Sequence, residues 1–201
     1  MKKSKILNDF FYNHTSRLKM VKRWGGFPEQ NFPENVLEHT FKTALLAEIM
    51  IALEEKHGQN KFDKFLILSG AVNHDLGEGT VGDIAWPIKQ DKELREKLEN
   101  IEKNEFLKNI SGLPGEAIEH FEKSYNVQLS PGTFEATFFE AIERLGYVEH
   151  AIAEYHSGKH DFKKVIESQH QPILNLMKEV ASLKILYEQY FLEDVEKILN
   201  E

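Results

Sequence analysis

The sequence predicts an all-α fold in one domain, and three observations lead to this prediction. The chain has 201 residues, a length at which a single domain is ordinary. Apolar residues recur at three- and four-residue spacing along most of the chain, without the strict alternation of a half-buried strand. Apolar residues make up 41% of the chain, with 12 glycines in addition. This composition is typical of globular proteins and excludes a disordered or collagen-like chain.

The charge balance and the lack of cysteine exclude several classes of function. With 33 acidic and 25 basic residues, the formal net charge is −8, which disfavours nonspecific binding to nucleic acid. The chain has no cysteine, so any metal must be held by His, Asp or Glu. No apolar run approaches the about 18 residues of a transmembrane helix, and the N-terminal stretch does not match a signal peptide. We expect a soluble cytoplasmic protein with no membrane or nucleic-acid partner.

The first predicted helix runs from Asn35 to His57. Asn35 and Glu38 match a capping box, and Gly58 suits the C-terminal end of the helix. The expected apolar face consists of Leu37, Phe41, Ala44, Leu45 and Ala52.

A second predicted helix, from about Asp63 to Asp75, is apolar on most sides and is expected to be buried. Its apolar residues are Phe65, Leu66, Leu68, Ala71 and Val72. Gly77 and Gly79 are expected to end it, so that residues 77–83 form a loop.

The rest of the chain is predicted to be helical as well. Residues 90–110 are highly charged and indicate a solvated helix with a narrow apolar edge at Leu94, Leu98 and Ile101 that could extend to Glu105 and Phe106. Helices are also expected over 116–125, over 134–156, and in two stretches of the tail, 163–200, that are split near Pro172. We expect residues 1–160 to form the main bundle and residues 161–201 to form a C-terminal helical extension packed on it.

The dipeptide His74-Asp75 stands at the end of the predicted buried helix. A carboxylate beside an imidazole is costly to bury unless both have partners. A divalent metal is one such partner, and nitrogen and oxygen ligands suit Mn, Fe, Co, Ni or Zn. The alternative is that Asp75 caps a turn and His74 is a satisfied core histidine.

Three further groups are expected near this dipeptide. His39 lies on the first predicted helix, while Glu78 and Asp83 follow in the glycine-punctuated stretch. Functional sites are commonly built on loops that a rigid scaffold positions. The pattern therefore favours a site of imidazole and carboxylate groups at this helix end.

Five short motifs stand in order along the chain: Arg23-Trp24, Glu34–His39, His74–Glu78, Gly82-Asp83 and Pro87–Lys89. Their order and spacing resemble those of the HD-domain metal-dependent phosphohydrolases, most of all the bacterial 5′-deoxynucleotidase branch. The resemblance implies a helical HD-domain bundle and an enzyme that hydrolyses (deoxy)nucleoside 5′-monophosphates to nucleoside and phosphate. It also suggests a homodimer.

The resemblance implies that His39, His74, Asp75 and Glu143 hold one divalent ion (Mn, Co, Fe, Ni, Zn or Mg). Such an ion orients the phosphate, neutralises developing charge and lowers the pKa of bound water. Glu78 would align or deprotonate the attacking water. Its alternative is a plain loop carboxylate.

The resemblance also implies substrate contacts. Arg23 and Lys89 would bind phosphate, for which the planar fork of an arginine is well suited. Trp24 would stack on a sugar or base, unless it is a core tryptophan. Asp83 would hold a substrate hydroxyl or assist protonation of the leaving group, and it could also cap a helix that starts at Ile84.

One residue departs from the family pattern, because Glu143 stands where HD domains have an aspartate. On a helical wheel the apolar stripe of this helix (Phe138, Ile142, Leu145, Ile152) faces away from Glu143. Glu143 is therefore either an inward ligand on a helix buried on two sides or a surface carboxylate. The alternatives to a 5′-deoxynucleotidase are an HD phosphohydrolase of another nucleotide or phosphomonoester and a catalytically degenerate HD-fold binding protein.

Overall fold

The structure is a computed structural model that describes residues 3–27, 29–85, 88 and 91–201. Helices dominate these residues, which contain no strand beyond an isolated bridge between Lys22 and Asn35. The all-α prediction is therefore confirmed. The α-helices are α1 (Lys3–Asp9), α2 (Val36–His57), α3 (Lys64–Asn73), α4 (Glu78–Val81), α6 (Lys92–Ile110), α7 (Gly115–Tyr125), α8 (Phe134–His156), α9 (Lys163–Leu176), α10 (Ala181–Tyr190) and α11 (Leu192–Asn200). A π-helical turn (Phe10–His14) and 3-10 turns at Thr15–Met20, Asn126–Leu129 and His160–Phe162 complete the described elements.

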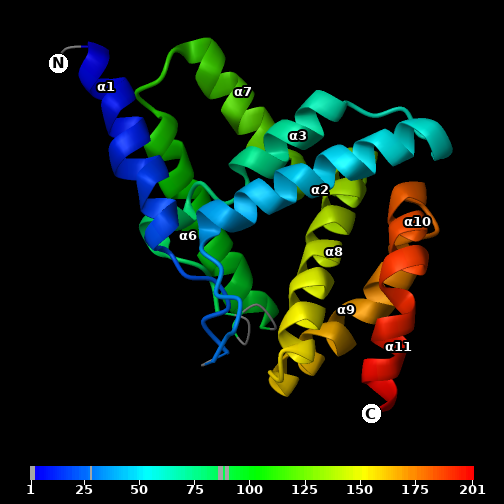
Figure 1. The fold of residues 1–201 in the computed structure, drawn as a ribbon. Helices are drawn as coiled ribbons and strands as arrows, with labels where there is room; N and C mark the ends of the chain where they lie inside the picture. The colour runs from blue at the N-terminus through cyan, green and yellow to red at the C-terminus, as the bar shows by residue number, and fades with distance from the viewer. Residues whose placement is uncertain (1–2, 28, 86–87, 89–90) are drawn as a thin grey trace.

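The two long helices α2 and α8 cross at the centre of the molecule, and the other elements surround this crossing (Figure 1). α3 packs against α2, α7 and α8, whereas α9 runs along α8 with α10 and α11 outside it. The main core forms along α8, where Phe138, Ile142 and Leu145 have no exposed surface. This is the apolar stripe that the sequence predicts, and Ile152, its fourth member, is 9% exposed.

The capping box that starts α2 is present as predicted. The Asn35 side chain accepts from the Glu38 backbone N–H, and the Glu38 carboxylate accepts from the Asn35 backbone N–H. Gly58 caps the other end.

The predicted buried face of α2 is wrong. Phe41 is 66% exposed, Leu45 is 50% exposed and Leu37 is 42% exposed. The helix instead buries His39, Thr40, Thr43 and Glu54 beside Val36, Ala47, Met50 and Ile51. Its inward face therefore mixes apolar residues with polar ones, and a pattern of apolar residues alone does not detect such a face.

The prediction for the second helix is only partly correct. Ile67, Gly70 and Ala71 of α3 are buried, but Phe65 is 65% exposed and Val72 is 47% exposed. The stretch predicted as a loop after Gly77 is also different, because Glu78–Val81 forms the one-turn helix α4. Gly77 allows this turn to lie against α6, since a Cβ there would come within 2.6 Å of the Glu102 carbonyl oxygen.

The charged helix α6 confirms the prediction of a solvated helix, and of its predicted apolar edge the C-terminal end is the buried part. Leu94 and Ile101 are 43% and 50% exposed, whereas Phe106 and Ile110 have no exposed surface. The C-terminal half of α6 therefore packs inward, in a small second core that includes Phe10, Leu18, Val36 and Tyr125.

The predicted break near Pro172 is also wrong. Pro172 lies inside α9, and the chain leaves the helix only between Met177 and Val180, so the tail forms three helices. A proline removes one backbone hydrogen bond but does not always end a helix, provided that packing holds the next turn. Ile173 has no exposed surface and supplies that packing.

The irregular segment before α2 is fixed by a buried carboxylate of α8. Glu154 has no exposed surface, and its two oxygens accept from the backbone N–H groups of Asn31 and Phe32 over 2.9 and 2.8 Å. The backbone N–H of Arg23 donates to the backbone carbonyl of Glu34 over 2.9 Å. These bonds place the segment with Arg23 and Trp24 beside the crossing of α2 and α8.

Candidate metal centre and cleft

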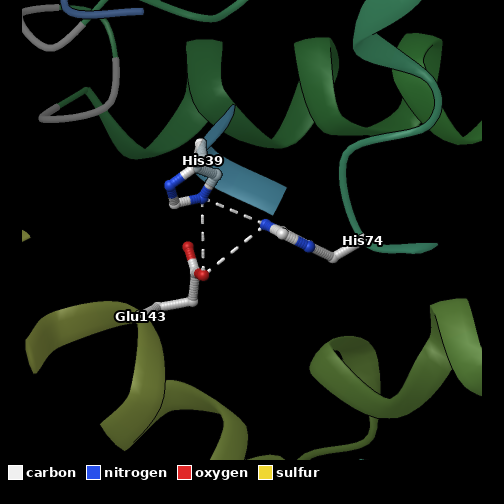
Figure 2. A group of neighbouring side chains, drawn as sticks. All are labelled: His39, His74 and Glu143. Atoms are coloured by element: carbon white, nitrogen blue, oxygen red, sulfur yellow. Dashed lines mark hydrogen bonds and ion pairs between the residues drawn. The ribbon is translucent and has the colours of Figure 1, made fainter. Parts of the chain in front are cut away.

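Three side chains from three parts of the fold converge where α2, α3 and α8 meet. His39 comes from α2, His74 caps the C-terminal end of α3, and Glu143 comes from α8. The His39 and His74 Nε2 atoms are 3.2 Å apart. Glu143 Oε1 lies 3.7 Å from His39 Nε2 and 3.5 Å from His74 Nε2 (Figure 2). The three residues form a group that could hold a metal ion.

Asp75 brings a fourth ligand-type atom to the same place. Its Oδ2 is 3.1 Å from His74 Nε2 and 3.5 Å from His39 Nε2. Consecutive side chains can turn toward one point here because α3 ends at Asn73. His74 and Asp75 then lie in the turn that leads to α4.

A contact of Nδ1 with the backbone fixes the orientation of the His74 ring. Its Nδ1 lies 3.0 Å from the Ala71 carbonyl oxygen, to which only a protonated Nδ1 can donate. In the neutral ring that contact leaves the Nε2 lone pair directed at the other three groups. A histidine held in this way by a backbone carbonyl is typical of metal ligands.

Glu143 points inward, which answers the question that the helical wheel left open. Its side chain is only 15% exposed, and Oε2 accepts a hydrogen bond from the Tyr147 hydroxyl over 3.0 Å. Oε1 is buried and has no hydrogen-bond partner among the described residues. α8 is buried on this side as well, since Phe139 and His150 are 2% and 4% exposed. A buried carboxylate oxygen without a donor fits a metal ligand.

The electrostatics of the cluster favour a cation at its centre. Burial alone would lower the pKa of His74, but the carboxylates of Asp75 and Glu143 outweigh burial and raise this pKa to about 9. Burial would raise the pKa of Asp75, but His74, Arg23 and His39 hold it well below its usual range. Positive charge is therefore stabilised at the position where the imidazole nitrogens meet the carboxylates.

These observations fit a divalent transition metal. Two imidazole nitrogens and two carboxylate oxygens are a ligand set that suits such ions. The donor atoms already lie within a few ångströms of one another, on helix ends and helices rather than on long loops. The chemistry of the donors and the buried oxygen of Glu143 therefore both agree with a bound ion.

Arg23 lies behind the cluster and is only 4% exposed. Its Nη1 is 3.0 Å from Asp75 Oδ2, and its Nε is 3.5 Å from Glu34 Oε2. Burial would lower the pKa of Arg23, but the carboxylates of Asp75, Glu78 and Asp83 raise it further above its usual value. The guanidinium thus holds protein carboxylates in this structure, and its predicted contact with a phosphate stays a prediction.

Glu34 belongs to the site, although the sequence pattern did not single it out within its motif. It is 6% exposed, and its Oε2 lies 3.7 Å from His39 Nδ1, opposite the nitrogen that faces the cluster. Its Oε1 pairs with Lys42 Nζ over 2.9 Å. In the sequence, Glu34 is simply an acidic residue five positions before His39. This spacing alone does not indicate that the two side chains are in contact.

Trp24 is buried, which favours the core alternative. It is 5% exposed, and its ring stacks on His150 with centroids 4.8 Å apart. Phe162 and Tyr147 meet it edge-on. Its backbone has a φ of 61°, which is uncommon for a residue other than glycine.

Asp83 Oδ2 accepts a hydrogen bond from the Trp24 backbone N–H over 3.2 Å. The predicted helix cap is wrong, because Ile84 and Ala85 are not helical. Lys89 lies outside the described residues. The predicted substrate roles of Asp83 and Lys89 stay predictions.

A polar cleft of about 790 Å³ opens onto the cluster. Its lining includes the largely buried His74, Asp75, Glu78 and Glu143 and the more exposed Arg95 and Arg144. Glu78 is only 2% exposed, and its backbone N–H donates to the Asp75 carbonyl at the start of α4. It therefore belongs to the site, although it lies on a helical turn rather than a loop.

A second cavity of about 250 Å³ lies on the other side of Tyr147. Its walls include Leu45, Ile49, Leu145 and Phe191, with His39 and Trp24 at its inner side. The larger cleft has the polar groups that a phosphorylated ligand needs, and the smaller cavity is mostly apolar.

No helix in the described part of the chain is long and apolar enough to cross a membrane.

Comparison with known proteins gives consistent results. A family model described as "5′-deoxynucleotidase YfbR-like" matches residues 10–195. A 5′-deoxynucleotidase of Photorhabdus laumondii is 28% identical over 159 residues, which cover 78% of this chain and 79% of that protein. A 5′-deoxynucleotidase of Klebsiella pneumoniae is 30% identical over 115 residues, and that match spans about half of either chain, 56% of each.

Among solved structures, an HD-domain phosphohydrolase of Listeria innocua aligns with a TM-score of 0.79 and 23% identity. The alignment covers 97% of this chain and 90% of that chain. A conserved hypothetical protein of Pyrococcus furiosus aligns with a TM-score of 0.61 and 20% identity. The likeness to the Listeria innocua structure confirms the prediction of an HD-domain fold.

Proposed function

The chain belongs to the YfbR-like 5′-deoxynucleotidase family, and from this premise we propose that it hydrolyses deoxynucleoside 5′-monophosphates with the help of one divalent metal ion. The products are the nucleoside and inorganic phosphate. The observation that carries the proposal is the convergence of His39, His74 and Glu143, with an oxygen of Asp75 beside them, where His74, Asp75 and Glu143 line a polar cleft.

We assign the four ligand positions to His39, His74, Asp75 and Glu143. A divalent ion supplies polarisation of the phosphate ester and a lower pKa of water when it is bound. Arg23 holds Asp75 in place through the 3.0 Å ion pair. Glu34 lies beside Nδ1 of His39 and orients its ring, as carboxylates behind metal-binding histidines do.

Glu78 is the proposed group that aligns and deprotonates the attacking water. It lines the cleft together with His74, Asp75 and Glu143. Because its side chain is almost fully buried, a water molecule beside it would be shielded from bulk solvent. A positioned carboxylate of this kind contributes typically about 10²–10⁴-fold to the rate.

The cleft suits a mononucleotide. Its volume of about 790 Å³ is within the about 300–1,000 Å³ typical of small-ligand sites. The metal group would take the phosphate, so the sugar and base would extend outward between α6 and α8. By family resemblance, Asp83 and Lys89 are further substrate contacts in this proposal.

We propose that the protein acts in the cytoplasm as a homodimer. The exposed apolar residues of α2 support self-association, because Phe41, Leu45 and Ile49 are at least half exposed on one helix face. Sedimentation of wild type and Phe41→Glu tests this proposal. A dimer that the substitution weakens supports it, and a monomeric wild type contradicts it.

The activity is tested by phosphate release from deoxynucleoside and ribonucleoside 5′-monophosphates with added Mn²⁺ or Co²⁺. We expect hydrolysis by the wild type, and a loss of about 10²–10⁴-fold in kcat in Glu78→Gln. Metal content of the variant should match the wild type, because Glu78 is not one of the assigned ligands. No phosphate release from any nucleotide by a metal-loaded wild type would indicate a degenerate binding protein instead.

A further inference from the structure

The hydrogen bond between Tyr147 and Glu143 has no part in the proposed hydrolysis. Both residues lie on α8, four positions apart, where helical side chains are neighbours. The Tyr147 hydroxyl donates to Glu143 Oε2 over 3.0 Å. The other oxygen, Oε1, lies 3.5 Å from His74 Nε2 and 3.7 Å from His39 Nε2. The two oxygens of one carboxylate therefore have different partners.

This division matters because the residue is a glutamate. A glutamate side chain has one more rotatable bond than an aspartate, and each free rotation costs entropy when the group is fixed. Without a second contact, the Glu143 carboxylate could turn either oxygen, or both, toward the two histidines. A hydrogen bond from a hydroxyl to a charged carboxylate is among the stronger ones. The Tyr147 hydroxyl thus selects Oε1 as the oxygen that faces the cluster.

The ring of Tyr147 has a separate role in packing. Its centroid lies 5.8 Å from that of Trp24, edge to face. The ring also lines both the 790 Å³ cleft and the 250 Å³ cavity. Phenylalanine at this position would keep these contacts and lose only the hydroxyl. The contribution of the hydrogen bond can therefore be separated from that of the aromatic wall.

We propose that Tyr147 is a positioning residue for Glu143, and that its hydroxyl lets a glutamate present a single oxygen to a divalent ion beside His39 and His74. The inference rests on the proposed function, since it takes this cluster to be the metal site. It extends that function by naming how the chain accommodates the longer side chain. Groups that hydrogen-bond to a metal ligand without touching the ion typically contribute about 10–100-fold to metal affinity.

The test is a titration of the metal-free protein with Co²⁺, comparing wild type with Tyr147→Phe. We expect the affinity for Co²⁺ to fall by about 10–100-fold, and the visible spectrum of bound Co²⁺ to change as the carboxylate shifts. The matched control is Tyr125→Phe, because the Tyr125 hydroxyl donates to Glu102 over 3.5 Å in the same cleft. That variant should keep the wild-type affinity and spectrum.

A second background shows whether the hydroxyl acts through Glu143. In Glu143→Gln the metal retains His39, His74 and Asp75 as ligands. Adding Tyr147→Phe to this variant should lower the affinity for Co²⁺ by less than about 3-fold, which is the deviation expected between substitutions that do not interact. Equal losses in both backgrounds would overturn the proposal, as would a Tyr147→Phe variant with wild-type affinity and spectrum. A wild type that binds Co²⁺ but hydrolyses no nucleotide would refute the proposed function and leave this inference standing.

Discussion

Helices α2 and α8 are similar in length, cross each other, and each contributes one side chain to the metal group, but they bury different kinds of surface. α8 packs an apolar stripe inward, with Phe138, Ile142 and Leu145 fully buried. α2 turns His39, Thr43 and Glu54 inward and leaves Phe41 and Leu45 exposed. The comparison shows that an apolar stripe defines the inward face of α8, whereas the inward face of α2 combines apolar residues of the main core with buried polar side chains.

The largest difference between the two helices should appear when one phenylalanine is truncated on each. Phe138→Ala on α8 should lower the free energy of unfolding by about 3–5 kcal/mol, because Phe138 is completely buried. Phe41→Ala on α2 is the matched control, and it should change the same quantity by less than about 0.5 kcal/mol when both proteins are measured as monomers, since the proposed dimer contact of Phe41 is then absent. Urea denaturation measures both. Similar losses would mean that Phe41 packs inside the protein and that α2 has a different orientation.

A smaller effect is expected from a polar contact that holds α2. Glu54 is 1% exposed, and its Oε2 accepts from the Ser182 backbone N–H at the start of α10 over 2.7 Å. Glu54→Ala should lower the free energy of unfolding by about 1–3 kcal/mol, because it leaves a buried donor without its acceptor. Glu55→Ala, which removes only the exposed pair with Lys64, should have almost no effect. If both variants melt like the wild type, polar anchoring of α2 is refuted.

The polar side of α8 gives a still smaller effect, which depends on pH. Burial lowers the pKa of His150, with Glu34 and Glu154 opposing this shift and Lys42 and Arg23 adding to it. The unfolded chain therefore takes up the proton first, near pH 6.5, and stability is lost as the pH falls below that value.

The measurement compares wild type and His150→Phe by chemical denaturation at pH 7.5 and pH 5.5. Phenylalanine can keep the stack on Trp24 but cannot bind a proton, so the variant should lose less stability between the two pH values. An equal loss in both proteins would show that His150 does not contribute to the acid sensitivity.

The same contrast explains what could be predicted from the sequence. The bounds and buried stripe of α8 follow from apolar spacing, because hydrophobic burial sets both. The inward face of α2 could not be predicted in this way, since His39 and Glu54 face inward and contact distant parts of the chain, His74 and Ser182. The predicted helix break near Pro172 was wrong for a related reason, because packing of the following turn overrides the local cost of the proline.

Within the site, the chain order of motifs pointed to His39, His74 and Asp75, and the structure brings these three together. The inward direction of Glu143 depends on α8 being buried on two sides, which one helical wheel cannot show. Tyr147 and Glu34 could not be singled out at all. Their roles come from distances to Glu143, Arg23 and His39, and these distances are set by the tertiary fold.

The central claim is that α8 completes a metal site with α2 and α3 through Glu143. The most direct test is a titration of metal-free wild type and Glu143→Ala with Co²⁺ or Mn²⁺, followed by calorimetry. We predict one ion bound per chain in the wild type, and an affinity at least about 10-fold lower in the alanine variant, because a ligand of the ion has been removed. An alanine variant that binds the ion as tightly as the wild type would contradict the claim and remove Glu143 from the site.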